Sequence, residues 1–179
     1  AKKAGADCIK FQTHIVEKEM TKTKILPGKI SKTPLWDIIK NCELTANEEE
    51  KLSKYCKKKK ILFLSTPFSI SAIDRLEKIK MPAYKIGSGE LTNIPFLKHI
   101  AKKKKPVILS TGMSNMEEIK FAVELFKKSK TPLAILQTTS EYPCDYKDIN
   151  LGVISKYKKN FKIPIGISDH SLGIYTALG

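Results

Sequence analysis

Two lysines stand inside short apolar runs, where a charged side chain is unusual. Lys10 lies in the run Cys8–Gln12, and Lys85 lies in the run Ala83–Ile86. A lysine ammonium in an enclosed site needs an anionic partner. Either lysine alone could reach solvent or pair with a core carboxylate. The two together could clamp the phosphate or carboxylate of a ligand.

Alternation along the first run indicates which side chains share a face. Successive side chains of a strand point to opposite faces. Ile9 and Phe11 would then face covering helices, and Lys10 and Gln12 would point to the opposite, interior side. The pattern therefore predicts polar groups in the interior at this strand.

A glycine-containing turn follows the second lysine. Gly87, Ser88 and Gly89 come directly after the run, and such a turn can present backbone N–H groups to an anion. Glu90 comes next. It could be the salt-bridge partner of the lysines or a group that gives and takes a proton. The residues alone leave both roles open.

A histidine stands just after the last apolar run, in Ser168-Asp169-His170. A histidine there could bind a metal, act as a general base or be a hydrogen-bonded structural residue. No HxxxH spacing supplies a second ligand. His14 is a candidate second histidine, although it is more typical of a substrate-loop or surface residue. The pattern by itself does not predict a metal site.

Six apolar runs of strand length alternate with helical patterns along the chain. The predicted strands are Cys8–Gln12, Ile61–Ser65, Ala83–Ile86, Val107–Ser110, Leu133–Gln137 and Ile165–Ser168. Capping boxes predict helix starts at Thr45–Glu48 and at Ser114–Glu117. The stretch from His14 to Leu44 contains Pro-Gly and Thr-Pro pairs, and we expect a long functional loop there.

Strand and helix in regular alternation predict an α/β fold with parallel strands and helical crossovers. An eight-stranded (β/α) barrel and an open doubly wound sheet both fit this alternation. No GxGxxG follows any predicted strand. A barrel takes about 250 residues, so a TIM (β/α)8 barrel would have about six of its eight βα units in these 179 residues.

Every predicted strand ends in polar residues, and loops at this end carry the active site of a parallel barrel. The residues are Lys10 and Gln12, Ser65 and Thr66, Lys85 with Gly87–Glu90, Ser110 and Thr111, Gln137–Ser140, and Ser168–His170. Hydroxyls, amides and lysines converging on one mouth predict a site for a small anionic ligand.

Composition limits the alternatives. The chain is long enough for one substantial core, and 33 Lys and Arg against 18 Asp and Glu give a net charge of +15. The surplus is lysine, which is poor at bidentate phosphate or base contacts, so a solvated role at helix ends is favoured over nucleic-acid binding. Four cysteines without CxxC spacing indicate a reducing compartment. With no membrane-span pattern and no signal-peptide pattern, we expect a cytoplasmic protein.

Several segments together resemble the sialic acid synthase family, which includes the legionaminic and pseudaminic acid synthases. The matching segments are Gly5–His14, Ser65–Ser69, Tyr84–Glu90, Leu109–Met113, Glu141–Pro143 and Gly166–Gly173. The resemblance implies a (β/α)8 barrel that condenses phosphoenolpyruvate with an open-chain N-acylated hexosamine, such as N-acetylmannosamine or a diacetamido-trideoxyhexose. It also implies a divalent metal acting as a Lewis acid, Mn²⁺ first and Mg²⁺ or Co²⁺ as alternatives, and a homodimeric full-length protein.

The resemblance assigns a role to individual residues. Glu90 becomes the catalytic acid/base or electrostatic residue, His170 becomes a metal ligand, and Gln12 and Tyr142 face the sugar. The full set carried over for substrate binding is Lys10, Gln12, Thr66, Lys85, Ser88, Ser110, Ser140, Tyr142 and Ser168. Ser140 stands where some members carry asparagine.

The chain also departs from the family pattern. Ala1 is not methionine, Gly5 would stop a helix, and a helix begins near Ser171. We therefore expect one partial catalytic barrel over residues 1–179, truncated at both ends. The family's first strand, its last strand with the second metal histidine, and its C-terminal antifreeze-like domain would be absent. Such a fragment would be inactive by itself.

Two other functions compete with this one. Phosphoenolpyruvate aldolases that make octulosonate or heptulosonate phosphates bind a sugar phosphate and should need a cluster of arginines, whereas this chain has one, Arg75. A basic anion-binding module without enzymatic activity would use the surface charge, with steep salt dependence. It predicts no role for Lys10 or Lys85.

Overall fold

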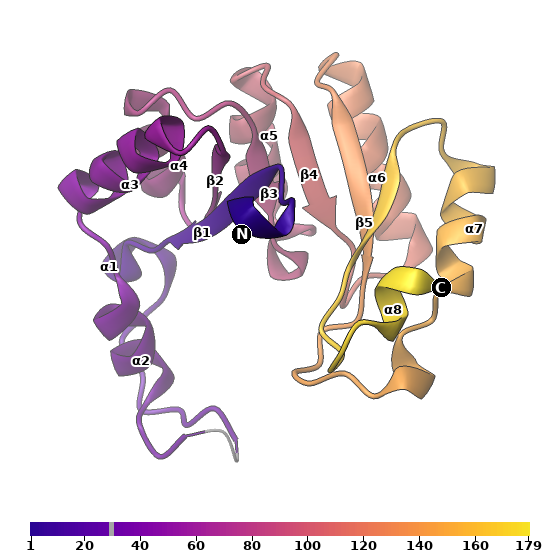
Figure 1. The fold of residues 1–179 in the computed structure, drawn as a ribbon, viewed down its shortest axis with the longest axis horizontal. Coiled ribbons are helices and arrows are strands. Elements are labelled where there is room, and N and C mark those ends of the chain that lie inside the picture. The colour runs from indigo at the N-terminus through magenta and orange to yellow at the C-terminus, as the bar shows by residue number, and fades with distance from the viewer. Residues whose placement is uncertain (29–30) are drawn as a thin grey trace. The chain divides into compact units, whose positions relative to one another are not determined.

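The computed structural model describes residues 1–28 and 31–179. Contacts divide the chain into two compact units, where the sequence led us to expect one core. Unit 1 is Ala1–Pro82 and unit 2 is Ala83–Gly179. Figure 1 shows the helices and strands of both.

Unit 1 contains two parallel strands and the helices that follow them. β1 and β2 pair in register from Cys8 opposite Leu62 to Thr13 opposite Pro67. The elements are the 3₁₀ helix η1 (Lys2–Ala4), β1 (Cys8–Thr13), α1 (Val16–Glu19), α2 (Leu35–Cys42), α3 (Ala46–Lys58), β2 (Leu62–Pro67) and α4 (Ile70–Lys78).

Unit 2 contains four parallel strands in the order β3-β4-β5-β6, joined by helical crossovers. Its elements are β3 (Tyr84–Ile86), η2 (Ser88–Glu90), α5 (Ile94–Lys102), β4 (Val107–Ser110), α6 (Met116–Lys128), β5 (Leu133–Thr138), η3 (Tyr146–Asp148), α7 (Gly152–Asn160), β6 (Ile165–Ser168) and α8 (Tyr175–Leu178). The predicted α/β class with parallel strands is confirmed, and each of the six predicted strands is present to within a residue or two.

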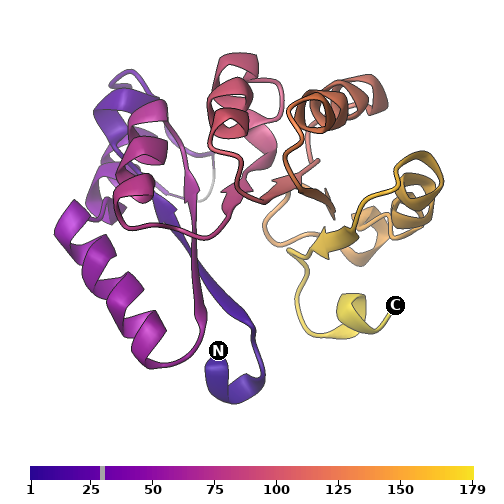
Figure 2. The ribbon, with the colours of Figure 1, turned by 90° about the horizontal axis from the view of Figure 1, so that it is seen from above.

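The two faces of the unit 2 sheet differ. Helices α5, α6 and α7 lie on one side of the strands (Figure 2), and Val107, Leu109 and Ile135 are buried on that side. Their neighbours Ile108 and Ala134 alternate with them and are only half-buried. The strand period of two therefore turns one face toward the helices and leaves the other face less buried.

Helix starts follow the predicted caps, with one correction. Thr45 and Glu48 form the capping box of α3 as predicted. The box of α6 is Asn115 with Glu118, not Ser114 with Glu117. The Asn115 side chain accepts from the backbone N–H groups of both Glu117 and Glu118. Asparagine is among the strongest N-caps, and here it takes that position one residue further along the chain.

The predicted long loop from His14 to Leu44 is wrong in part. Helix α1 and the eight-residue helix α2 lie within it. Pro34 is the N-cap of α2, so the Thr-Pro pair that indicated a loop in fact precedes a helix. Residues 29 and 30 of this stretch lie outside the described residues.

Two lysine runs, Lys57–Lys60 and Lys102–Lys105, occupy helix ends, as predicted. α3 ends at Lys58 and α5 ends at Lys102. Lys60, Lys80, Lys104 and Lys130, which follow four successive helices, all have a positive φ of 55–57°.

In the part of the chain that is described, no helix is both long enough and apolar enough to cross a membrane.

Candidate active site

A buried cation lies at the end of the first two strands of unit 2. Lys85 on β3 is 8% exposed and Ser110 at the end of β4 is 3% exposed. The Lys85 ammonium donates to Ser110 Oγ at 2.6 Å and to the Ile86 carbonyl at 2.8 Å. Lys85 pairs with Ile108 in the sheet register, so Lys85 and Ser110 share the face opposite the helices. The structure therefore brings together two residues that the sequence assigns to one anion.

Two further hydroxyls meet at Gly112, just beyond Ser110. A Cβ added at Gly112 would lie 2.5 Å from Ser140 Oγ and 2.9 Å from Ser88 Oγ, and 3.1 Å from the Thr138 carbonyl. A side chain at position 112 would therefore force the hydroxyls of Ser88 and Ser140 to move. Ser88 and Ser140, which follow β3 and β5, are thus brought close together around β4's loop. The sequence analysis assigned no role to Gly112.

Glu90 stands at the edge of this group, at the end of η2. It is half-buried, and its Oε2 accepts a hydrogen bond of 2.7 Å from the Asn93 side chain. This partner differs from the lysine that the sequence predicted as one possibility for Glu90. Asn93 stands two residues before Pro95, a spacing typical of a helix N-cap. That spacing does not show which group the amide nitrogen of the capping asparagine contacts.

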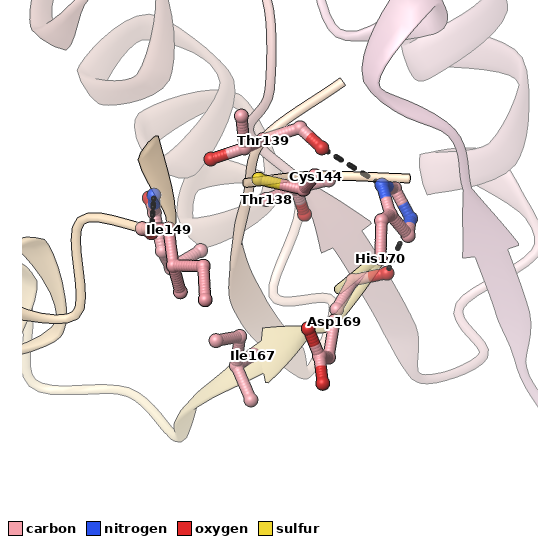
Figure 3. A pocket seen from close by; sticks show the side chains of 9 residues that line it. Thr138, Thr139, Cys144, Ile149, Ile167, Asp169 and His170 are labelled. Carbon is pink, nitrogen blue, oxygen red and sulfur yellow. Dashed lines mark hydrogen bonds between the residues drawn. The ribbon is translucent and has the colours of Figure 1, made fainter. Parts of the chain in front are cut away.

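His170 follows β6 and has a defined ring orientation. Its Nδ1 lies 2.7 Å from the Thr139 carbonyl (dashed in Figure 3), and its Nε2 lies 3.4 Å from Ser168 Oγ. A carbonyl only accepts hydrogen bonds, so Nδ1 carries the proton and the neutral ring keeps a lone pair on Nε2. Metal-binding histidines commonly donate their other ring N–H to a carbonyl in this way. The ring therefore fits the metal-ligand role.

Other metal donors do not gather around this ring. Within residues 1–28 and 31–179, no group of three His, Cys, Asp or Glu side chains could hold a metal ion. Asp169 is engaged in a local turn, where its carboxylate accepts from the Ser171 N–H and hydroxyl. These hydrogen bonds lower the pKa of Asp169, the backbone one most.

Tyr142 covers the histidine. Its ring stacks on His170 with centroids 4.0 Å apart, while the side chain remains 71% exposed. The small pocket beside His170 is lined by Thr138, Cys144 and their neighbours (Figure 3). It has a free volume of only about 10 Å³, about enough for one water. A ligand as large as a sugar therefore does not fit in this pocket.

The predicted residues of unit 1 lie at the ends of its two strands. Gln12 on β1 is the register partner of Thr66 on β2. Gln12 is exposed and Thr66 is buried. Lys10 lies two residues before Gln12, on the same face, and is exposed. Loss of hydration around its ammonium nevertheless lowers the pKa of Lys10. Because Lys10 belongs to unit 1 and Lys85 to unit 2, their convergence on one ligand stays a prediction.

His14 is not a surface residue. It is 8% exposed, its Nδ1 lies 2.9 Å from Glu19 Oε1, and its ring stacks on Phe68 at 4.5 Å. The surface alternative for His14 is therefore wrong. A buried histidine paired with a carboxylate and stacked on an aromatic ring joins the loop after β1 to the loop after β2.

Comparisons with known proteins agree with the resemblance. The chain is 37% identical to the N,N'-diacetyllegionaminic acid synthase of Campylobacter jejuni over 98% of its own length and 55% of that protein. It is 38% identical to the pseudaminic acid synthase of the same species over 97% of its length and 52% of that protein. The chain thus spans about half the length of these relatives.

Solved structures give the same result for the fold. The N-acetylneuraminic acid synthetase of Leptospira borgpetersenii matches with a TM-score of 0.88 and 35% identity, over 98% of this chain and 59% of that one. A truncated heptulosonate 7-phosphate synthase from Thermotoga maritima matches with a TM-score of 0.62 and 19% identity, over 72% of this chain and 51% of that one, which shows a shared fold alone. Both neighbours are TIM barrels.

The polar groups at the strand ends and the similarity to these relatives both agree with the family that the sequence resembles. The model of the NeuB family matches residues 1–179, the whole of the chain. The chain belongs to the NeuB family.

Proposed function

We propose that this chain is part of the catalytic barrel of a synthase. The synthase condenses phosphoenolpyruvate with an N-acylated hexosamine to a nine-carbon sialic-type acid. The observation that carries the proposal is the buried Lys85–Ser110 pair, with the hydroxyls of Ser88 and Ser140 gathered beside it at Gly112. A buried ammonium among hydroxyls at the strand ends attracts a small ligand with a phosphate and a carboxylate. The relatives named as legionaminic and pseudaminic acid synthases support a synthase that makes a sialic-type acid.

The proposed reaction forms one carbon–carbon bond and releases phosphate. The enol carbon of phosphoenolpyruvate attacks the aldehyde carbon of the open-chain sugar, and the aldehyde oxygen takes up a proton. Water then adds to the cationic carbon that bears the phosphate, and the bond from that carbon to the phosphate oxygen breaks. The products are inorganic phosphate and a 2-keto acid.

Each residue has a task in this scheme. Lys85 and Ser110 bind the anionic groups of phosphoenolpyruvate, with Lys10 completing the charge from unit 1 and Ser88, Ser140, Thr66 and Ser168 around it. Gln12 and Tyr142 contact the sugar. Glu90 is the carboxylate that moves a proton at the sugar oxygen or the attacking water. The phosphate and the carboxylate of phosphoenolpyruvate are thus fixed while the sugar aldehyde is presented to its enol carbon.

His170 would supply one ligand of a divalent metal through Nε2, and the described residues hold no group of three metal donors around it. When bound, such an ion polarises a carbonyl as a Lewis acid, and Mn²⁺ is the ion we propose. Thr139 keeps the His170 ring in the required tautomer, and Tyr142 packs against one face of the ring. These contacts hold the ring before any ion arrives.

We also propose a closed (β/α)8 barrel, a homodimer and a cytoplasmic location for the full-length protein. Similarity to TIM-barrel neighbours supports the closed barrel. The amino-sugar products in the names of the relatives support a role in carbohydrate biosynthesis. Light scattering of the purified full-length protein measures the oligomer, with twice the chain mass expected.

One assay tests the proposed reaction. Phosphate release from phosphoenolpyruvate is measured with N-acetylmannosamine or a diacetamido-trideoxyhexose, with Mn²⁺ present or removed by a chelator. We expect release only when a sugar acceptor is added, and we expect chelation to abolish it and Mn²⁺ to restore it. Release without acceptor, or with erythrose 4-phosphate or arabinose 5-phosphate instead, would contradict the proposal. Full activity in the chelator would contradict the metal.

A further inference from the structure

Glu90 sits between two tight turns of the backbone. Its N–H donates to the Gly87 carbonyl at 3.1 Å, and its own carbonyl accepts from the Asn93 N–H at 3.1 Å. The buried Leu91 anchors the next position. The main chain of Glu90 is therefore fixed, but a glutamate side chain has three further rotatable bonds, and this one is only half-buried. Packing alone does not orient its carboxylate.

The Asn93 amide makes two hydrogen bonds in different directions. Its Oδ1 accepts from the Phe96 N–H at 3.2 Å and so caps helix α5. Its Nδ2 donates to Glu90 Oε2 at 2.7 Å. The backbone N–H can only meet the amide oxygen, and the carboxylate can only meet the amide nitrogen. Both partners therefore select the same orientation of the amide.

Helix α5 provides a rigid support for this amide. Phe96, Leu97 and Ile100 on its inner face are at most 2% exposed. The cap ties Asn93 to the first turn of that buried helix, and the second hydrogen bond extends the connection to the carboxylate. A hydrogen bond to an ionised acceptor is shorter and stronger than one between neutral groups, consistent with the 2.7 Å distance.

We propose that Asn93 is a positioning residue that holds the Glu90 carboxylate in its working orientation, a role beyond capping α5. The inference rests on the proposed role of Glu90 in proton transfer. An oriented carboxylate matters in the chemical step, so loss of the second hydrogen bond lowers kcat and leaves phosphoenolpyruvate binding almost unchanged.

Two substitutions separate the cap from the positioning contact. Serine and aspartate cap helices about as well as asparagine, so Asn93→Ser and Asn93→Asp keep α5 intact. Neither supplies the amide donor, and aspartate adds a second negative charge next to Glu90. Asn115 caps α6 through its own Oδ1, so Asn115→Ser is the matched control at the next helix.

Kinetics and thermal unfolding of the full-length protein give the first readout. We expect Asn93→Ser to lower kcat roughly tenfold, since misplacement of a catalytic group by about 1 Å can cost a hundredfold. Asn93→Asp should lower it further. The KM for phosphoenolpyruvate and the Tm should stay near the wild-type values in both, and Asn115→Ser should leave kcat unchanged.

A double-mutant cycle with Glu90→Gln completes the test. If Asn93 acts through Glu90, Asn93→Ser has no further effect on kcat once Glu90 is Gln. An equal loss of kcat from Asn93→Ser in the wild type and in the Glu90→Gln variant would overturn the inference. A wild-type kcat in Asn93→Ser together with a low kcat in Glu90→Gln would also overturn it. The proposed function would survive either result. Wild-type kcat in Glu90→Gln would instead remove the proposed role of Glu90, and the inference with it.

Discussion

The buried side chains of Lys85 and Glu49 differ in their hydrogen bonding. Lys85 has close acceptors in Ser110 and the Ile86 carbonyl. Glu49 on α3 is 2% exposed, yet within the described residues neither of its carboxylate oxygens has a hydrogen-bond partner. Arg75 Nη1 lies 3.7 Å from Glu49 Oε2 and donates instead to the Leu44 carbonyl. Burial raises the pKa of Glu49, against the opposing effects of Thr13 and Arg75.

The Glu49→Gln variant should therefore be more stable than the wild type, and the difference should grow as pH rises. A carboxyl whose pKa is raised on folding favours the folded state below its ordinary pKa of 4.5, and that contribution is lost as pH rises through the folded pKa. Glutamine does not ionise and loses nothing. Urea unfolding at pH 8 should show a gain of about 1 kcal/mol, shrinking as pH approaches 4.5.

The matched control is Glu50→Gln, one position along the same helix. Glu50 is exposed and pairs with Lys54 at 2.7 Å, so its removal should change stability by only a few tenths of a kcal/mol at any pH. A Glu49→Gln protein that is less stable than wild type at pH 8 would show that the ion pair with Arg75 outweighs the burial of the carboxylate.

The sequence predicted many site residues but few of their contacts. A lysine within an apolar run predicted a buried cation at two positions, which the burial of Lys85 confirms and the exposure of Lys10 does not. The contact of Asn93 with Glu90 and the crowding around Gly112 were not predictable, because both depend on how separate loops approach each other in space. The exact neighbours of a half-buried side chain leave no periodic signal in the sequence.

At the scale of the elements, four lysines occupy the position where helices usually place glycine. Lys60, Lys80, Lys104 and Lys130 have positive φ after α3, α4, α5 and α6. The left-handed conformation costs about 1–2 kcal/mol for a residue with a Cβ. Positive charge at these helix ends offsets part of this, because it complements the helix dipole.

Lys130→Gly should therefore stabilise unit 2. Glycine adopts the observed φ of 55° without strain. Glycine also has a greater conformational entropy in the unfolded state, which offsets part of this effect, so the free energy of unfolding should rise by about 0.5–1 kcal/mol. Lys128→Gly, within α6, is the control, and it should cost about 1 kcal/mol. Chemical unfolding of both variants checks this, and a loss of stability in Lys130→Gly would show that the lysine charge matters more than the backbone strain.

The elements themselves were largely predictable, and the exceptions have a local cause. Strands were found because short apolar runs end in polar turns, and the α3 capping box marked its helix correctly. Helix α2 was missed because a Pro-Gly and a Thr-Pro pair precede it, although Pro34 proved to be its N-cap. The start of α6 was misplaced by one residue because Ser114 and Asn115 are both good caps.

For the whole molecule, the central claim joins residues from both units. Polar strand ends in unit 1 (Lys10, Gln12, Thr66) and in unit 2 (Lys85, Ser110) would form one site only if the parallel strands close into a barrel. The NeuB family match over residues 1–179 and the TM-score of 0.88 to a sialic acid synthetase support that arrangement. The carboxyl ends of parallel barrel strands share one face.

Calorimetric titration of phosphoenolpyruvate into the full-length protein tests this claim most directly. Lys10→Met and Lys85→Met remove one charge each and keep the side-chain volume, with the exposed Lys120→Met as control. Removing a buried charge partner costs at least about 2 kcal/mol, so Lys85→Met should raise the Kd roughly thirtyfold or more. Lys10 is exposed in unit 1, so Lys10→Met should raise the Kd by a smaller factor, while Lys120→Met binds like wild type. Wild-type affinity in either Lys10→Met or Lys85→Met would contradict a shared anion site.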